Sequence, residues 1–275
     1  LRFLEKEIGI KISVIPPGNN EIIDLKKLES SITKKTRLIV TVHASNVTGD
    51  LMPVKEIGKI AKRHNLIFMV DAAQTAGTYP IDVEELNIDL LAFTGHKALF
   101  GPQGVGGLYI CQGVELQPLK QGGTGSNSEF EEQPDFLPDK YESGTPNTVG
   151  IAGLGAGVKY ILDEGIDKIT KRKKELTEYL SKKLKTIKDI QIYGKQNSGR
   201  KTSIVSFNLK NFSSSEISSV LSQNFEIMTR PGLHCSPAAH RTIGTFPQGT
   251  VRISLSYFNT EQEIDYLVGV LGKSF

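Results

Sequence analysis

Cysteine and long hydrophobic runs are both scarce in this 275-residue chain. Its two cysteines, Cys111 and Cys235, lie far apart in sequence, which excludes a disulfide-rich scaffold and is typical of a reducing compartment. No apolar segment approaches the ~20 residues that a membrane-spanning helix needs, and no secretory signal peptide is visible. We therefore expect a cytoplasmic protein that has no membrane partner.

A strong excess of one charge is lacking as well. The 33 Lys and Arg residues nearly balance the 30 Asp and Glu residues, which leaves a net charge of +3. Nucleic-acid binding, which needs a clustered basic face, is not expected. The densest basic run, residues 171–174, is followed by Leu176 and Leu180 at helical spacing. We interpret this run as the solvated face of an amphipathic helix.

Apolar segments alternate with helical patterns through the first half of the chain. We expect strands at residues 10–15, 38–42, 66–70, 90–93 and 106–110, and helices at residues 24–31, 54–64 and 149–163. This alternation predicts an α/β fold with a mostly parallel sheet. The run at 38–42 is almost entirely apolar, which is typical of a strand covered on both faces. A long polar loop is expected at 122–138.

The pattern changes near residue 164, where a basic amphipathic helix begins. Strands are expected at 203–209, 225–228 and 250–255, with a helix from Ser214 and a last helix capped by Thr260 and Glu263. We predict two domains, an α/β large domain at 1–163 and a small α+β domain at 164–275. Residues 1–8 resemble the end of a helix closed by Gly9. We therefore expect the large domain to be incomplete at its N-terminus.

Asp71 follows directly after an apolar strand, and Gln74 comes three residues later. Ligands bind at the carboxyl ends of strands in open α/β sheets. A carboxylate at this position can pair with a protonated ring nitrogen, and the Gln74 amide can reach a ring hydroxyl. The alternative is that Asp71 only caps the turn that follows it.

Lys97 stands in the segment Thr94-Gly95-His96-Lys97, directly after the expected strand at 90–93. A lysine that is buried among other cations has a lowered pKa and attacks aldehydes. Thr94 and His96 are suited to hold a phosphate, and Gly95 lets the backbone approach it. Although a lone lysine in a loop is usually only a surface residue, the position of Lys97 at the end of a second strand favours a functional role.

Cys235 lies in a segment of small and polar residues that predicts an exposed loop. Arg230, His234 and His240 are near it in sequence, and a positive charge there would favour the thiolate. The alternative is a buried structural cysteine, which is our interpretation of Cys111. No metal site is expected in the chain.

Several motifs occur in an order that resembles one enzyme family. They are HASNVTG at 43–49, VDAAQ at 70–74, GHK at 95–97, SGTPN at 143–147, RPGLHC at 230–235 and RISLSYFNT at 252–260. Together they resemble the class V aminotransferase family over nearly all of the chain. The segment 230–235 resembles the active-cysteine motif of its cysteine desulfurase and selenocysteine lyase branch. The resemblance implies a fold-type I transferase that depends on pyridoxal 5′-phosphate.

The resemblance also implies a role for each matching residue. Lys97 would form the Schiff base to the cofactor and move a proton. The other cofactor contacts would come from Asp71 at the ring nitrogen, Gln74 at the ring oxygen, Thr94 and His96 at the phosphate, and Thr145 at the phosphate of the neighbouring subunit. A homodimer is therefore implied. The substrate carboxylate would be held by Asn46, Arg252 and Arg230, since arginine suits bidentate carboxylate binding.

On this resemblance we expect a cysteine desulfurase. It would convert L-cysteine to L-alanine, form a persulfide on Cys235 and pass the sulfur to an acceptor protein. Leu233 occupies a position where one branch of the family has His, so the subgroup stays open. The alternatives are a selenocysteine lyase, another class V enzyme, or a non-catalytic fragment without a complete cofactor site.

Overall fold

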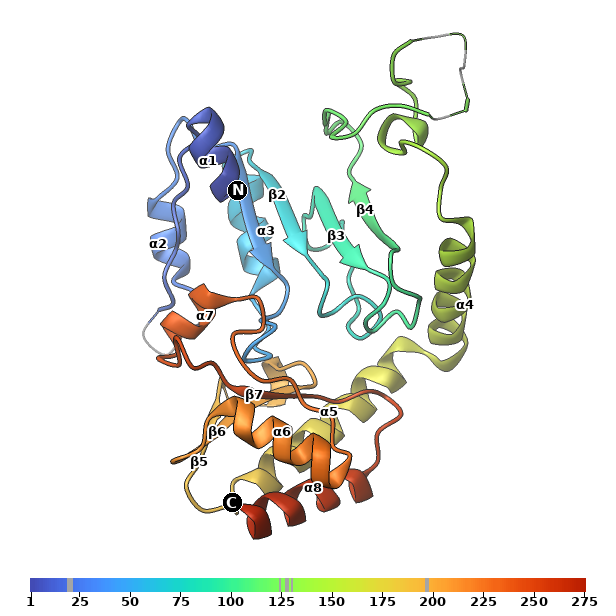
Figure 1. Ribbon diagram of the computed structural model, residues 1–275. Coiled ribbons are helices and arrows are strands. Elements are labelled where there is room, and N and C mark those ends of the chain that lie inside the picture. The colour runs from blue at the N-terminus through green and yellow to red at the C-terminus, as the bar shows by residue number, and fades with distance from the viewer. Residues whose placement is uncertain (19–21, 124, 127–128, 130, 196–197) are drawn as a thin grey trace.

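The computed structural model describes residues 1–275 except 19–21, 124, 127–128, 130 and 196–197. Its α-helices are α1 (Arg2–Ile8), α2 (Leu25–Ser30), α3 (Val54–Arg63), α4 (Thr148–Glu164), α5 (Ile166–Leu184), α6 (Ser214–Phe225), α7 (Pro237–Thr242) and α8 (Glu261–Ser274). Its strands are β1 (Leu38–Val42), β2 (Ile67–Asp71), β3 (Leu90–Thr94), β4 (Gly106–Ile110), β5 (Ile190–Tyr193), β6 (Ile204–Leu209) and β7 (Val251–Ser254). The strands form two separate sheets, drawn above and below α7 in Figure 1.

The first sheet has the order β1-β2-β3-β4. β1, β2 and β3 are parallel, and only β4 runs antiparallel to its neighbour, so the expected α/β fold with a mostly parallel sheet is confirmed. Val42 at the end of β1 pairs with Asp71 at the end of β2, and Asp71 pairs with Ala92 of β3. The residues that follow these strands therefore emerge at one edge of the sheet.

One face of this sheet packs on α3 and builds the first core. Alternate strand residues such as Ile39 and Phe68 point into that core together with Ile57 of α3. The opposite residues of β1 remain about 40% exposed, as Val40 shows. The expectation that β1 is covered on both faces is therefore wrong, because the described residues bury only the alternate side chains that face α3.

The second sheet, β5-β6-β7, is antiparallel throughout. Its core is filled by side chains from α5, α6 and α8, among which Leu180, Phe207 and Leu271 are fully buried. The capping box of α8 is confirmed, since Thr260 and Glu263 exchange both hydrogen bonds. The predicted division between residues 163 and 164 falls at the end of α4, where Gly165 alone separates α4 from α5. That division stays a prediction.

Two expected strands are wrong, and one strand was missed. Residues 10–15 and 226–228 run without ladder pairing, and Phe225 ends α6. Both segments carry β-branched or aromatic residues, but no neighbouring strand supplies hydrogen-bond partners. The strand β5, by contrast, pairs with β6 over four residues. Its alternation of Ile190 and Ile192 with Gln191 was a signal that could have predicted it.

The turn at residues 45–51, which follows β1, joins the two sheets. The hydroxyl of Ser206 donates to the carbonyl of Val47, and the amide of Thr202 donates to the carbonyl of Gly49 at 2.7 Å. Val47 is fully buried at this junction. The turn after β1 is therefore fixed against the second sheet by hydrogen bonds to its backbone carbonyls.

The helices α4 and α5 make the covalent connection between the sheets. Figure 1 shows α4 beside β4 and α5 continuing toward the lower sheet. The interpretation of residues 171–174 as a solvated face is wrong for Lys173, which is half-buried and donates to the hydroxyl of Thr78 at 3.1 Å.

Among the described helices, none is both long and apolar enough to span a bilayer. The expected loop at 122–138 forms no helix or strand where it is described, and residues 124, 127–128 and 130 lie outside the described part.

Candidate active site

Lys97 lies in a tight turn at the end of β3. The amide of Gly95 donates to the carbonyl of Val105, and the amide of Gly101 donates back to the carbonyl of Gly95, both at 2.9 Å. A Cβ on Gly95 would meet Val105 and Leu154 at 3.1 Å, so only glycine fits this crossing without a shift. The turn leaves the side chain of Lys97 exposed at the sheet edge.

The charges around Lys97 show which predicted residues the fold brings together. Partial burial lowers the pKa of Lys97, and the guanidinium groups of Arg252 and Arg230 lower it further. Asp71 and Cys235 act on the same ammonium in the opposite direction and raise its pKa. The lysine therefore lies within electrostatic reach of residues from both sheets.

Thr94, His96, Asp71 and Gln74 lie at the same edge of the first sheet. The hydroxyl of Thr94 and Nδ1 of His96 share a hydrogen bond of 2.8 Å. Asp71 is exposed, and one of its carboxylate oxygens accepts the amide of Ala73 at 2.9 Å, as in the capping alternative. Gln74 is half-buried in the turn that follows β2. Capping and ligand binding are compatible for Asp71, because a carboxylate has a second oxygen.

Cys235 belongs to a loop that lies against β7. Its thiol is exposed, and the guanidinium of Arg230 donates to Sγ at 3.2 Å. The backbone of Arg230 pairs with that of Arg252 in β7, with N–O distances of 3.1 and 2.8 Å. His234 and Cys235 both have positive φ angles, 51° and 62°. The exposed loop predicted for Cys235 is confirmed, and the buried alternative is wrong.

Asn46 connects this loop to the turn that follows β1. Its side-chain amide donates to the carbonyl of His234 at 2.7 Å, and Arg252 donates through Nη1 to the carbonyl of Asn46 at 2.9 Å. Among the described residues, Nε of Arg252 is buried without a hydrogen-bond partner. The three residues predicted to hold a carboxylate, Asn46, Arg230 and Arg252, therefore lie beside Cys235, and one of them has an unused donor.

The predicted influence of the two histidines on the thiolate is wrong. Burial lowers the pKa of His234 to about 4, with Arg252 adding to the effect, and burial also lowers the pKa of His240. Both imidazoles are therefore neutral at pH 7 and supply no positive charge. Arg230 is the cation that contacts the thiol.

Thr145 lies in the segment between β4 and α4. It is exposed and lies just before α4, whose N-cap is Asn147. No hydrogen bond joins Thr145 to the Lys97 turn in the described part of the chain. Its predicted contact with a neighbouring subunit stays a prediction.

The residues at the edge of the first sheet suit a phosphorylated pyridine aldehyde. They offer an amine whose pKa is lowered, an exposed carboxylate beside it, and a hydroxyl–imidazole pair on the same turn. The buried Nε of Arg252 adds a donor that has no protein partner in the described residues. This donor set matches the aldehyde, the ring nitrogen, the phosphate and a substrate carboxylate.

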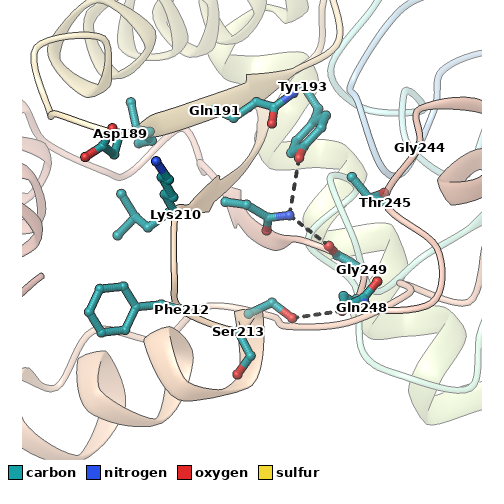
Figure 2. A pocket seen from close by; sticks show the side chains of 14 residues that line it. Asp189, Gln191, Tyr193, Lys210, Phe212, Ser213, Gly244, Thr245, Gln248 and Gly249 are labelled. Atoms are coloured by element: carbon teal, nitrogen blue, oxygen red, sulfur yellow. Dashed lines mark hydrogen bonds between the residues drawn. The ribbon is translucent and has the colours of Figure 1, made fainter.

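A pocket of about 520 Å³ lies on the second sheet and is lined by residues of β5, β6 and the segment before β7. Figure 2 shows Tyr193 and Gly249 in its wall. The side-chain amide of Asn208, which also lines the pocket, donates to the hydroxyl of Tyr193 and to the carbonyl of Gly249. None of the predicted site residues lines this pocket. Gly249 does contact the Cys235 loop, because a Cβ built on it would lie 2.2 Å from the carbonyl group of Gly232.

Comparison with known proteins identifies the family of this chain. Residues 1–267 match the family model described as aminotransferase class V. The chain is 37% identical over 275 residues to a probable cysteine desulfurase of Pyrococcus abyssi, covering 98% of this chain and 67% of that protein. It is 34% identical over 267 residues to a cysteine desulfurase of Escherichia coli O157:H7, covering 95% of this chain and 64% of that protein.

A solved structure shares the fold. The apo structure of a cysteine desulfurase from Thermococcus onnurineus superposes with a TM-score of 0.87 and 31% identity, covering 100% of this chain and 69% of that one. The chain thus spans about two thirds of the length of the curated relatives that it matches.

Proposed function

The chain belongs to the class V aminotransferase family, and from that membership we propose that it is a pyridoxal 5′-phosphate-dependent cysteine desulfurase. It would convert L-cysteine to L-alanine and retain the sulfur as a persulfide on Cys235. One observation carries the proposal. The exposed thiol of Cys235 contacts Arg230 and lies within electrostatic reach of Lys97. A transaminase has no need for a thiol at this position.

The cofactor would be held by Lys97, Asp71, Gln74, Thr94 and His96, with Thr145 reaching it from a second subunit. When bound, pyridoxal phosphate supplies an aldehyde that condenses with amines and a ring that withdraws electrons from the substrate. The carboxylate of Asp71 would keep the proton on the ring nitrogen. The Thr94–His96 pair would donate to the phosphate.

The substrate would lie between the two sheets. Arg252 and Asn46 would bind its carboxylate, with Arg230 beside them, which directs the substrate sulfur toward Cys235. Lys97, whose pKa is lowered, has a larger neutral fraction than an ordinary lysine and can accept the proton on the substrate Cα.

Cys235 would take the sulfur by nucleophilic attack. A bond forms between its Sγ and the substrate sulfur while the bond between that sulfur and Cβ breaks. The electron pair of the broken bond stays with the carbon skeleton, which takes up a proton and becomes the methyl group of alanine. In the net exchange, one sulfur atom moves to Cys235 and one hydrogen moves to carbon.

We also propose the setting of this reaction. Exposure of Cys235 suits transfer of its sulfur to an acceptor protein, because a partner can reach the thiol directly. A homodimer would bring Thr145 to the second active site. The two unpaired cysteines fit the reducing cytoplasm.

Replacement of Cys235 tests the function. Cys235→Ala should lower the rate of alanine production from L-cysteine by at least about a hundredfold. The visible absorbance of the bound cofactor should stay unchanged. The measurement is alanine released under reducing conditions. Cys111→Ala is the matched control and should keep normal activity.

The activity of this variant on selenocysteine distinguishes the proposed function from the closest alternative, a selenocysteine lyase. If Cys235→Ala loses activity on cysteine but keeps it on selenocysteine, the thiol is needed for sulfur alone, as proposed. Full cysteine activity in this variant would overturn the proposal.

A further inference from the structure

We propose that His234 is a positioning residue that holds the thiol of Cys235 against Arg230. This inference rests on the proposed function, since it concerns the residue that would carry the sulfur. His234 has a bulky side chain directly before the reactive cysteine, and only 2% of it is exposed. It is therefore a structural neighbour of Cys235 that substrate does not reach.

The backbone at Cys235 needs external support. His234 and Cys235 adopt φ angles of 51° and 62°, the left-handed region that disfavours residues with a Cβ. Two consecutive residues of this kind persist only where surrounding contacts hold them. Without such contacts, the loop would relax and the thiol would leave its present direction.

The imidazole of His234 supplies one such contact. Its Nε2 lies 3.0 Å from the hydroxyl of Thr250, and its ring packs against that of His240 at a centroid distance of 5.3 Å. Thr250 is fully buried, and its backbone pairs with Gly232 through two hydrogen bonds of 3.1 Å. The side chain is therefore anchored in rigid structure beneath the loop.

The carbonyl of His234 is held from the other side by the side-chain amide of Asn46 at 2.7 Å. With both its ring and its carbonyl fixed, His234 has little freedom to rotate. Cys235 is then left with its thiol directed at the guanidinium of Arg230, 3.2 Å away. Burial keeps the imidazole neutral, so it acts through its position and not through a charge.

A pair of alkylating reagents can measure the position of the thiol. Iodoacetate is anionic and iodoacetamide is neutral, so the ratio of their rates reports the positive field at the sulfur. Beside Arg230, with Arg252 and Lys97 near, Cys235 should show a higher ratio than Cys111 in the same protein. The two cysteines are distinguished by mass spectrometry of their peptides.

Two variants remove the anchor, and one restores it. Thr250→Val keeps the side-chain shape but loses the hydroxyl, and His234→Leu loses the ring nitrogen. Each should lower the rate ratio at Cys235 by at least about threefold, because the thiol leaves the cationic group. His234→Gln should recover at least half of the ratio, since its Nε2 can reach the hydroxyl of Thr250.

Thr177→Val is the matched control. It removes another buried threonine hydroxyl, which belongs to α5 and donates to the carbonyl of Lys173 at 2.7 Å. It should leave the ratio unchanged even where it lowers the unfolding temperature. If the His234→Leu variant does not fold, the rate ratio at Cys235 in the Thr250→Val variant decides whether the proposal holds.

A wild-type ratio in folded Thr250→Val would overturn the proposal. The alkylation assay needs neither cofactor nor turnover of cysteine. A protein that fails to release alanine but shows the expected ratios would therefore contradict only the proposed function.

Discussion

The ammonium of Lys97 lies among charges of both signs. Partial burial and the guanidinium groups of Arg252 and Arg230 favour its neutral form, whereas Asp71 and Cys235 favour the charged form. The net result is a lowered pKa. A larger neutral fraction than that of an ordinary lysine would serve the proposed attack on an aldehyde and the proposed proton transfer.

Replacement of this amine should abolish turnover. Lys97→Ala should lower alanine production by at least about a thousandfold, because both covalent attachment of the cofactor and proton transfer need the amine. Borohydride reduction followed by mass spectrometry should find no fixed pyridoxyl group. Lys174→Ala, an exposed lysine of α5, is the control and should behave like wild type. A pyridoxyl group fixed at a single other lysine in the Lys97 variant would contradict the assignment.

The sequence predicted the positions of the candidate site but not how the fold holds them. Lys97, Asp71 and Cys235 were chosen from three separate segments, and the fold places them within electrostatic reach of one another. The neutrality of His234 was not predicted. Its charge depends on burial by residues such as Thr250, which a linear sequence does not reveal.

At the scale of elements, α5 contacts the segment that follows β2 through a half-buried lysine. Burial lowers the pKa of Lys173 from 10.5 to about 8, and its ammonium donates to Thr78. Since the folded pKa lies below the unfolded one, the unfolded state binds more protons between pH 8 and 10.5. Stability contributed by this group therefore rises with pH across that window.

Lys173→Met should remove this dependence. The free energy of unfolding of the wild type, relative to the variant, should rise by on the order of 1–3 kcal/mol from pH 8 to 10.5. Urea denaturation at several pH values measures it. Lys174→Met, on the exposed side of the same helix, should show no such change. Parallel pH curves for the wild type and Lys173→Met would show that the lysine is not desolvated.

The loop between α7 and β7 supports the Cys235 loop at Gly249. Gly249→Ala should destabilise the protein by about 2–4 kcal/mol, because the new Cβ adds a clash to left-handed strain. It should also slow alkylation of Cys235 by displacing Gly232. Gly244→Ala is a close match, with a φ of 74° against 76° but nothing within 4 Å of the new Cβ. Gly244→Ala should lower the free energy of unfolding by only about 1–2 kcal/mol. Thermal unfolding of both variants makes the comparison, and equal losses would contradict the contact.

Strands of the first sheet were predicted well, and each of them has at least one partner strand. The bounds of β1 and β4 agree with the expected ranges, and those of β2 and β3 agree to within a residue. Residues 10–15 have the same β-branched composition but no ladder partner. Pairing is a tertiary property, so composition alone could not distinguish these cases.

At the scale of the whole molecule, the site needs both sheets and, in our proposal, two subunits. Thr145 lies just before α4, and Val149 and Leu162 of that helix are 84% and 75% exposed. Such apolar exposure on one helix is typical of a surface that a partner covers. The proposed homodimer would place Thr145 of one subunit beside Lys97 of the other.

Mixing two impaired variants tests this arrangement. Thr145→Ala and Lys97→Ala should each be impaired alone. In a mixed dimer, one site would contain both wild-type residues, so a random mixture should recover up to about a quarter of wild-type activity. Activity is measured after subunit exchange. No recovery, despite exchange shown by sedimentation of labelled subunits, would contradict a shared site.

The solvent exposure of Cys235 also has a practical consequence for any preparation of the protein. A thiol that a sulfur acceptor can reach is equally open to dissolved oxidants. Oxidation to the sulfenic acid can be reversed, but sulfinic and sulfonic acids are not recovered by ordinary reductants. The proportion of competent molecules would then decline with storage in air while the fold stays intact. Rates should therefore be expressed per titrated Cys235 thiol and not per mole of polypeptide.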